Sequence, residues 1–402
     1  FRKGGEAMFK WSWPLAALVV LSSCVGPGQD RPPYPPIDRP PEPVLENAAA
    51  AGVTAGPSFR ALRLTEADAS AALSAFRASC DWPSEKADAS GLTRPEDWLG
   101  SCAAAHRWEG DALTFFETYF ETAQIGDGTA FATGYFEPEI LGSRTPRPGY
   151  DVPVYRVPDD LVRAWPADMP ESEREGRPPL GRYDDAGNFV EYYSRAEIED
   201  GALAGRGLEI AWAADPVEFF FLQIQGSGLL RAPDGSVMRI GYAGQNGHGY
   251  TGIGGLMRER GLLGDGPGQY PGSMQGIVQY IRDNPEEGRA LMRENESWIF
   301  FRELDTSGPL GSLGVPVTRQ NSVAVDPRFV PYGAPVVLEM DRPVASGMWV
   351  AQDTGGAIKG ANRFDTFWGN GGDSREVAGG MSARGHALIL LPKGTVARLT
   401  GR

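Results

Sequence analysis

The sequence predicts an α+β protein with β-barrel elements, and three observations lead to this fold class. Apolar residues recur at helical spacing in 65–76 and again in 113–123, which predicts two helices near the start of the folded part. Beyond residue 130, short apolar segments stand between Gly and Pro residues, as in β-barrels and β-sandwiches. The 53 glycines and 33 prolines among 402 residues exceed the usual share of about 12%. Turns and short strands must therefore be abundant.

The remaining elements follow from local signals. We expect helices at 194–203, where Ser194 and Glu197 form a capping box, at 216–222, where Pro216 follows Asp215, and between 273 and 295. Strands are expected at 131–138, 151–157, 208–213, 237–244, 298–304, 322–326, 334–340, 347–353 and 386–392.

The N-terminal segment resembles a lipoprotein signal peptide. Lys10 precedes an apolar stretch at 14–21, which is followed by Ser22, Ser23 and Cys24. A transmembrane anchor is the alternative, but the stretch is much shorter than the roughly 20 residues that a bilayer requires. We therefore expect residues 1–23 to be removed and Cys24 to carry a lipid. Residues 1–7 precede Met8 and are left out of the fold prediction.

Residues 24–57 are rich in proline and poor in large apolar side chains. Such a segment buries too little surface to fold and is expected to be a linker. Export would place the chain in an oxidising compartment, where Cys80 and Cys102 are the cysteines left to pair. A disulfide between them is expected, with two buried free thiols as the alternative.

The charge and the residue types restrict the chemistry. A net charge of -14 argues against nucleic acid as a partner, because that affinity comes mainly from basic surfaces. The three His and three Cys residues show no metal-ligand spacing, so no metal or other cofactor is expected. Carboxylates are therefore the expected catalytic groups.

The segment 349–369 carries the strongest chemical signal. An apolar strand ends in Asp353, a Gly-rich turn follows, and Asp365 lies among Phe364, Phe367 and Trp368. Aromatic neighbours would raise the pKa of a carboxyl group, as an acid catalyst near neutral pH requires. Asp353 before Thr-Gly-Gly is equally consistent with a simple Asx-turn.

Other catalytic classes fit the sequence poorly. The tripeptide 353–355, Asp-Thr-Gly, occurs in aspartic proteases, which need two such aspartates. The nearest second copy, at 305–307, has Ser in place of Gly, so only a homodimer would complete the pair. Serine-hydrolase, phosphate-loop, zinc-protease and dinucleotide-binding motifs are missing from the sequence.

Four segments identify a family resemblance. The run QDTGGAIKGANRFDTFWG at 352–369 resembles the three-aspartate domain of the membrane-bound lytic murein transglycosylase A family. The segments ATGYFEP at 132–138, FFFLQIQGSG at 219–228 and YAGQNGHGYTGIG at 242–254 resemble the same family, in the same order. The resemblance implies a double-psi β-barrel domain (58–134 plus 243–402), an inserted β-rich glycan-binding domain (135–242) and a glycan groove between them.

The resemblance also implies a reaction. Such enzymes cleave the β-1,4 bond between N-acetylmuramic acid and N-acetylglucosamine in peptidoglycan, with the muramyl C6 hydroxyl as nucleophile. One carboxyl group then serves as acid and base, whereas an ordinary glycosidase needs two. By position in the motif, Asp365 resembles that group and Asp353 a supporting carboxylate, while Asp373 is the candidate for the third aspartate.

The remaining matched residues would contact the glycan. They are Thr133, Tyr135, Gln223, Gln225, Ser227, Tyr242, Asn246, His248 and Lys359. Each tyrosine would stack on a sugar or belong to the core, and strand alternation would turn one of the two glutamines away from the groove. His248 also fits a structural role, and Lys359 a solvated loop position.

The expected partner is therefore the glycan strands of peptidoglycan. The lipid is expected to anchor the chain in the outer membrane, because Val25 rather than Asp follows Cys24. The expected location is periplasmic. Cell-wall synthases or hydrolases are candidate protein partners. A non-catalytic, peptidoglycan-binding lipoprotein is the alternative function.

Overall fold

The computed structural model describes residues 45–401. The signal peptide, Cys24 and most of the expected linker lie outside these residues. Within 45–401, no helix is both long and apolar enough to cross a membrane.

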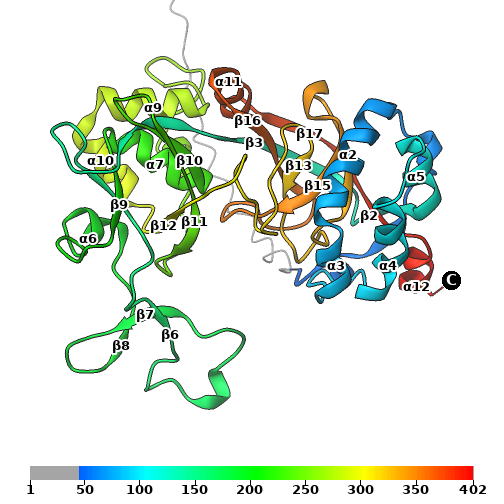
Figure 1. The fold of residues 1–402 in the computed structure, drawn as a ribbon, viewed down its shortest axis with the longest axis horizontal. Helices are drawn as coiled ribbons and strands as arrows, with labels where there is room; N and C mark the ends of the chain where they lie inside the picture. The colour runs from blue at the N-terminus through cyan, green and yellow to red at the C-terminus, as the bar shows by residue number, and fades with distance from the viewer. Residues whose placement is uncertain (1–44, 402) are drawn as a thin grey trace, which may run out of the picture. The chain divides into compact units, whose positions relative to one another are not determined.

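The first sheet closes on itself into a ring of six strands (Figure 1). Its order is β17-β14-β15-β13-β16-β3, and β3 pairs back with β17. Two neighbouring pairs are parallel, β13 with β15 and β16 with β3. The bounds are β3 Thr129–Glu137, β13 Ser322–Ala324, β14 Pro335–Met340, β15 Gly347–Asp353, β16 Arg363–Asn370 and β17 Ser382–Pro392. The interior is filled by buried side chains that include Trp349, Phe364 and Trp368.

Helices and a large aromatic cluster support one side of this barrel. The helices are α2 Glu66–Ser79, α3 Asp81–Glu85, α4 Pro95–Ala105 and α5 Ala112–Tyr119. The helix predicted to continue beyond residue 119 is shorter than expected, because Phe120 begins strand β2 (Phe120–Ile125), which pairs with β17. Phe120 still packs against Phe76 and Phe115 of this cluster. Its apolar side chain thus reaches the core from a strand rather than from a helix.

The expected linker ends earlier than residue 57. Helix α1 (Ala48–Ala51) and strand β1 (Val53–Ala55) precede that position, and β1 extends the first sheet by pairing with β2. The Ala48 amide donates to the Arg328 carbonyl at 2.8 Å, and the Thr122 hydroxyl donates to the Pro57 carbonyl. Residues 47–57 are therefore part of the fold, because backbone pairing compensates for their lack of large apolar side chains.

The second sheet has six strands in the order β12-β11-β10-β4-β9-β5. Their bounds are β4 Glu139–Ser143, β5 Val152–Tyr155, β9 Glu209–Ala213, β10 Ser227–Arg231, β11 Val237–Gln245 and β12 Ile299–Glu303. Strand β11 runs past residue 242 and pairs with β12, whose Phe300 and Phe301 lie in the core of this sheet. The inserted domain, which we call the second unit, thus extends to about residue 303 rather than to 242.

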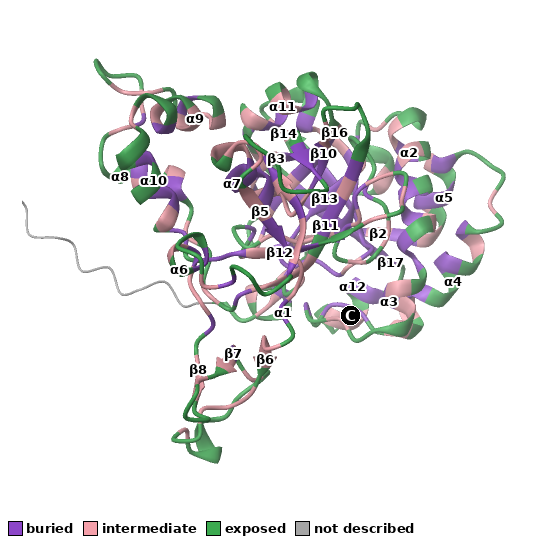
Figure 2. Ribbon diagram, turned by 60° about the vertical axis from the view of Figure 1, so that its left-hand side comes forward, coloured by how far each residue is buried: buried purple, intermediate pink, exposed green. Residues whose placement is uncertain are grey.

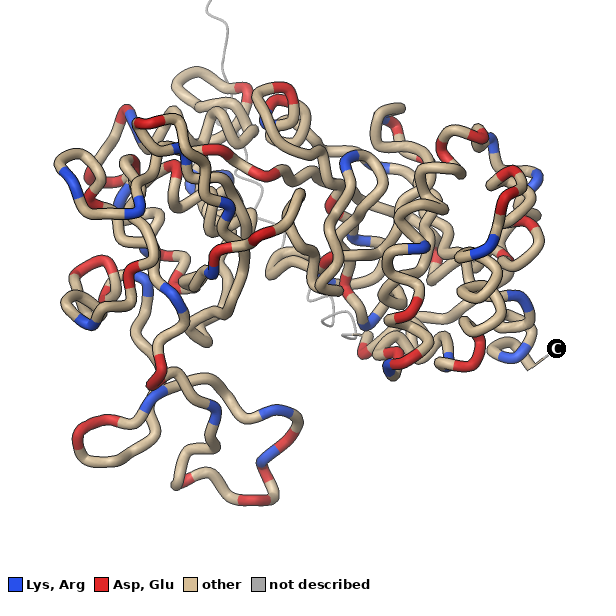
Figure 3. Tube along the Cα trace, viewed as in Figure 1, with Lys and Arg blue, Asp and Glu red and all other residues tan. Residues whose placement is uncertain are grey.

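Helices and a small exposed sheet complete the second unit. The helices are α6 Arg195–Glu199, α7 Pro216–Gln225, α8 Ile253–Glu259, α9 Met274–Asp283 and α10 Pro285–Arg293. Strands β6 Val162–Arg163, β7 Leu180–Tyr183 and β8 Phe189–Val190 form an arm that is largely exposed or half-buried, whereas the barrel strands are mostly buried (Figure 2). Basic and acidic residues are interspersed along the described chain (Figure 3).

Short elements complete the description. They are η1 Phe59–Ala61, η2 Glu171–Glu173, η3 Pro343–Ala345, α11 Gly372–Gly379 and α12 Thr395–Thr400.

A disulfide joins Cys80, which follows α2, to Cys102 in α4, with 5.5 Å between the Cα atoms. We predict that non-reducing peptide mapping of exported protein will link these two cysteines. Replacing both by serine should lower the free energy of unfolding by about 3 kcal/mol, because the bond closes a loop of 22 residues. Two alkylatable thiols in native, oxidised protein would contradict the bond.

Two truncations test the revised linker. Removal of residues 1–44 should leave the melting temperature unchanged relative to protein that lacks only residues 1–23. Removal of residues 1–57 should lower it, because β1 and the contacts of Ala48 and Pro57 are lost. If the proteins that lack residues 1–44 and residues 1–57 melt at the same temperature, the linker extends to residue 57, as first expected.

Candidate active site

The barrel places two carboxylates on one face. Ala324 of β13 pairs with Asp353 of β15 on one side and with Asp365 of β16 on the other. Residues in register on adjacent strands point to the same face of a sheet, and two strand spacings separate the two Cα atoms by about 10 Å. The two aspartates therefore share a site although a Gly-rich turn separates them in sequence.

Asp365 has one side-chain hydrogen bond within the described chain. The Thr133 hydroxyl, in register on the parallel strand β3, donates to Asp365 Oδ1 at 2.6 Å. Burial raises the pKa of Asp365 to about 6, and the like charge of Asp353 adds to this, while Thr133 and Arg363 act in the opposite direction. This is the range in which a carboxyl group can both give and take a proton near neutral pH.

One of the three aromatic residues that were expected to desolvate Asp365 lies on the same face of the sheet as Asp365. Phe364 and Trp368 belong to the barrel interior, because strand alternation turns them away from the Asp365 face. Phe367 shares that face and packs against Tyr135, with 5.0 Å between the ring centroids. The predicted rise in the pKa of Asp365 is confirmed, but one of the three aromatic neighbours rather than all three lies on its side.

Asp353 accepts hydrogen bonds from several segments. The Tyr135 hydroxyl donates to Oδ2 at 3.0 Å, and the Ser312 amide and hydroxyl donate to Oδ1 at 2.9 and 2.8 Å. The Thr354 amide also donates to Oδ1, at 2.8 Å. Burial raises the pKa of Asp353 although all these donors lower it. A local turn alone does not explain contacts from such distant residues.

Two residues near Asp365 were missed by sequence reasoning. Arg363 donates from Nη2 to the Thr133 hydroxyl at 2.9 Å. Tyr250 belongs to the second unit, and its Cβ lies 3.2 Å from where a Cβ on Gly356 would be. Burial raises the pKa of Tyr250 and the charge of Asp365 adds to this, so Tyr250 lies within the electric field of Asp365. This close approach leaves little room for a side chain at position 356, and no sequence pattern shows it.

Two of the predicted glycan contacts are used inside the protein. Gln223 lies in helix α7 rather than in a strand, is 2% exposed, and accepts from Arg195 at 2.6 Å. Asn246 is 0% exposed and hydrogen bonds to the backbone of Tyr193, Glu296 and Trp298. These two predictions are corrected: both amides stabilise the second unit and are not free for a ligand.

The other predicted contacts are more accessible or partly engaged. Gln225 accepts from the Phe136 amide at 3.0 Å, and His248 lies 2.6 Å from the Tyr192 carbonyl oxygen. Ser227 is half-buried at the start of β10, and Lys359 is exposed on its loop. Tyr242 is 51% exposed on β11.

Asp373 does not join the two carboxylates. It lies exposed in the first turn of α11 and forms an ion pair with Arg319 at 2.7 Å, which holds its pKa low. Asp326, in contrast, is 2% exposed, pairs with Arg328 at 2.7 Å and accepts from the Gly360 amide at 2.9 Å. It thereby fixes the loop between Asp353 and Asp365.

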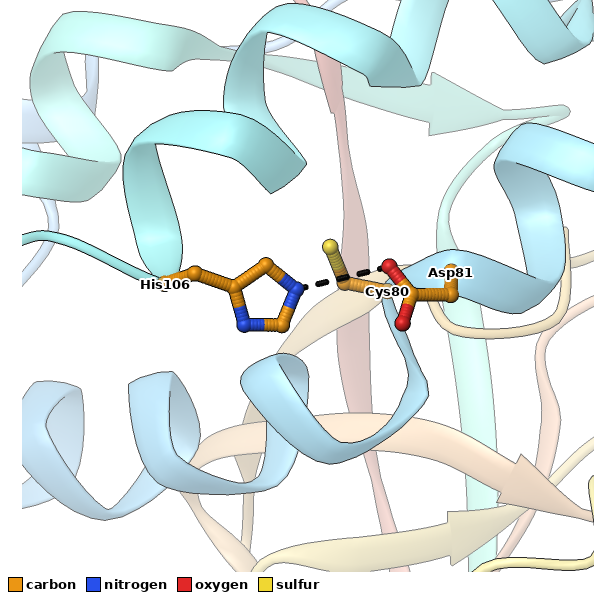
Figure 4. A group of neighbouring side chains, drawn as sticks. All are labelled: Cys80, Asp81 and His106. Atoms are coloured by element: carbon orange, nitrogen blue, oxygen red, sulfur yellow. Dashed lines mark hydrogen bonds and ion pairs between the residues drawn. The ribbon is translucent and has the colours of Figure 1, made fainter.

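Two other features lie outside this site. A cavity of about 250 Å³ is lined by residues of β3, β4, α7, α9 and α11, on the side of β3 that carries Phe136 rather than Thr133. Within residues 45–401, ligand atoms of Cys80, Asp81 and His106 lie within 4.8 Å of one another (Figure 4). Cys80 is bonded to Cys102 and offers no thiolate, so this group does not suit a metal ion.

Comparisons with known proteins agree with this architecture. Residues 131–302 match the MltA specific insert domain, and residues 321–391 match the 3D domain. A membrane-bound lytic murein transglycosylase A of Vibrio cholerae is 30% identical over 277 residues, which are 65% of this chain and 66% of that protein. The matched segment thus spans about two thirds of the curated relative.

Solved structures extend the match. A membrane-bound lytic murein transglycosylase from Agrobacterium tumefaciens is 30% identical, covers 87% of this chain and 99% of its own, and has a TM-score of 0.75. The protein MltA from Neisseria gonorrhoeae is 32% identical, covers 86% and 94%, and has a TM-score of 0.65. These findings confirm the resemblance noted from four sequence segments: the chain belongs to the membrane-bound lytic murein transglycosylase A family.

Proposed function

We propose that this chain is a lytic transglycosylase that cleaves the β-1,4 bond between N-acetylmuramic acid and N-acetylglucosamine in peptidoglycan. The observation that carries the proposal is Asp365, a half-buried carboxyl group with a pKa of about 6 that has a second half-buried carboxylate beside it. The names of the relatives, which are murein transglycosylases, support the choice of substrate.

The proposed reaction uses Asp365 twice. In its neutral form, Asp365 gives its proton to the glycosidic O4 as the C1–O4 bond breaks and positive charge develops at C1. The resulting carboxylate then accepts the proton of the muramyl C6 hydroxyl while O6 bonds to C1. The product ends in a 1,6-anhydro ring, and Asp365 is protonated again. No water is consumed, so a second catalytic carboxyl group is not required.

Asp353 is proposed to support this cycle. Its like charge helps to raise the pKa of Asp365, which favours the proton-bearing form that begins the reaction. Its hydrogen bonds to Tyr135 and Ser312 hold it in place. Asp353 therefore acts on the charge state of Asp365 rather than on the sugar.

We further propose a double-psi β-barrel with a glycan groove beside it. The closed ring of six strands and its two parallel pairs support this assignment. Tyr250 approaches the Gly356 loop from the second unit, which supports a groove on the face that carries Asp365. Tyr242, Gln225, Ser227 and Lys359 remain proposed contacts for sugars or peptide stems.

The proposed location is the periplasm, with the chain anchored to the outer membrane by a lipid on Cys24. The signal-peptide pattern supports it, and so do relatives that are named membrane-bound.

We predict that Asp365→Asn will lose at least about 100-fold in kcat, because the amide cannot carry the transferred proton. Asp373→Asn is the matched control: Asp373 is exposed and belongs to α11, so its activity should stay close to that of wild type. Mass spectrometry of the sugars released from purified sacculi measures both. Equal activities of the two variants would remove Asp365 from the mechanism.

The same assay in water labelled with heavy oxygen tests the type of reaction. Anhydro ends without label are expected, because O6 attacks C1. Labelled reducing ends would instead indicate hydrolysis and would give Asp353 a catalytic role. Glycan binding without any cleavage by the wild-type protein would favour the non-catalytic alternative.

The pKa of Asp365 predicts the pH dependence. The free enzyme needs neutral Asp365, so kcat/KM should fall as pH rises through about 6, approaching tenfold per pH unit. Asp353→Asn removes a like charge and should move this decline to lower pH. A decline that keeps its midpoint in that variant would contradict the electrostatic role of Asp353.

A further inference from the structure

The Thr133 hydroxyl lies between an arginine and the proposed catalytic carboxyl group. Arg363 Nη2 is 2.9 Å from Thr133 Oγ1, which is 2.6 Å from Asp365 Oδ1. Arg363 and Asp365 both belong to β16, and Thr133 lies in register with Asp365 on β3. The three side chains therefore form a short chain of hydrogen bonds within two paired strands.

The chemistry of these groups fixes the direction of the bonds. A guanidinium group can only donate, and a hydroxyl group has a single proton. Thr133 Oγ1 must therefore accept from Arg363, and its own proton is directed to Asp365. Asp365 Oδ1 is then an acceptor in both charge states. When Asp365 is neutral, its proton belongs on Oδ2.

We propose that Arg363 is a positioning residue, which acts through Thr133 to keep Oδ1 of Asp365 as an acceptor and to reserve Oδ2 for proton transfer to and from the glycan. This inference rests on the proposed function, since it assigns the reacting oxygen of the same carboxyl group.

Arg363 is held independently of Asp365. Its guanidinium carbon lies 5.0 Å from the centre of the Phe131 ring, and Nη1 donates to the Phe364 carbonyl. Within the described chain it forms no ion pair with Asp365 at 4.0 Å or less. The arginine is thus fixed by the barrel, and its contact toward Asp365 passes through Thr133.

The charged and titratable groups that act on Asp365 come from several elements. Arg363 lies on the same strand, Asp353 on β15, Tyr135 on β3 and Tyr250 on the loop after β11. Both tyrosines have raised pKa values and stay neutral near pH 7. Of these groups, Arg363 with Thr133 favours ionised Asp365, and Asp353 favours the neutral form.

The test compares the pH dependence of kcat/KM in Arg363→Met and Thr133→Val with that of the wild type. Methionine keeps an unbranched apolar side chain beside Phe131 but removes the charge and the donor. In both variants the decline in activity should move to higher pH, by about one pH unit. The kcat value at the new optimum should fall about tenfold, because Oδ2 is no longer reserved.

Three further variants separate positioning from structure. Arg384 also lies over the Phe131 ring, at 5.1 Å, so Arg384→Met removes a similar contact without touching Thr133 and should leave the midpoint unchanged. Thr133→Ser restores the hydroxyl and should return the midpoint to the wild-type value. In the double variant Arg363→Met, Thr133→Val, the loss in kcat should not exceed that of Thr133→Val by more than about twofold, since Arg363 acts through Thr133.

An unchanged midpoint in both Arg363→Met and Thr133→Val would overturn the proposal, whatever their overall activity. So would additive losses of kcat in the double variant. If Arg363→Met fails to fold, Arg363→Gln takes its place, because it also removes the charge but keeps a polar side chain at this half-buried position. The proposed function fails separately: there, the wild-type protein would release no anhydro ends.

Discussion

The site depends on the parallel pairing of β3 with β16. This pairing places Thr133 beside Asp365 and, two residues further, Tyr135 beside Phe367. On its other edge β3 pairs with β17 and closes the barrel. Residues of opposite parity on β3 face away from the site: a Cβ on Gly134 would lie 2.9 Å from the Ala378 Cα. One strand therefore supplies donors to both carboxylates and fixes the helix behind them.

The same strand leads into the second unit. Glu137 at its end is buried and pairs with Arg239 of β11 at 2.8 Å. The strand then continues into β4, and Gln225 of α7 accepts from the Phe136 amide. A buried ion pair is costly to break. The position of the second unit, and of Tyr250 within it, is consequently tied to the strand that holds Thr133.

Much of this architecture was predictable from local sequence signals. All nine expected strand segments contain a strand, and the helices after Ser194 and Asp215 begin where their caps indicate. The helical region expected between 273 and 295 consists of two helices, α9 and α10. The errors have physical reasons. Phe120 continues a helical spacing but pairs as a strand, and the weakly apolar 47–57 segment folds through backbone hydrogen bonds. Strand β16 was not expected, although it carries Asp365.

The site itself was predictable only as two aspartates with their neighbouring motif residues. Ser312 reaches Asp353 from a distant segment, and nothing in its local sequence distinguishes it from a solvated residue. Arg363 and Tyr250 lie within the matched motif segments, but their contacts toward the site depend on strand pairing and on the approach of the second unit. Gln223 and Asn246 failed as glycan contacts for the opposite reason. Their polarity is used to satisfy buried backbone and a buried arginine, which a motif match cannot separate from ligand binding.

The hydrogen bonds also support the different tasks that we propose for these two half-buried carboxylates. Asp353 accepts from four donors, three at Oδ1 and one at Oδ2, so both of its oxygens already accept hydrogen bonds. Asp365 accepts from Thr133 at Oδ1, and within the described chain Oδ2 has no hydrogen-bond donor. A group that exchanges a proton needs such an uncommitted oxygen. Donor number, rather than burial alone, thus supports the proposed proton transfer by Asp365 and the proposed electrostatic role of Asp353.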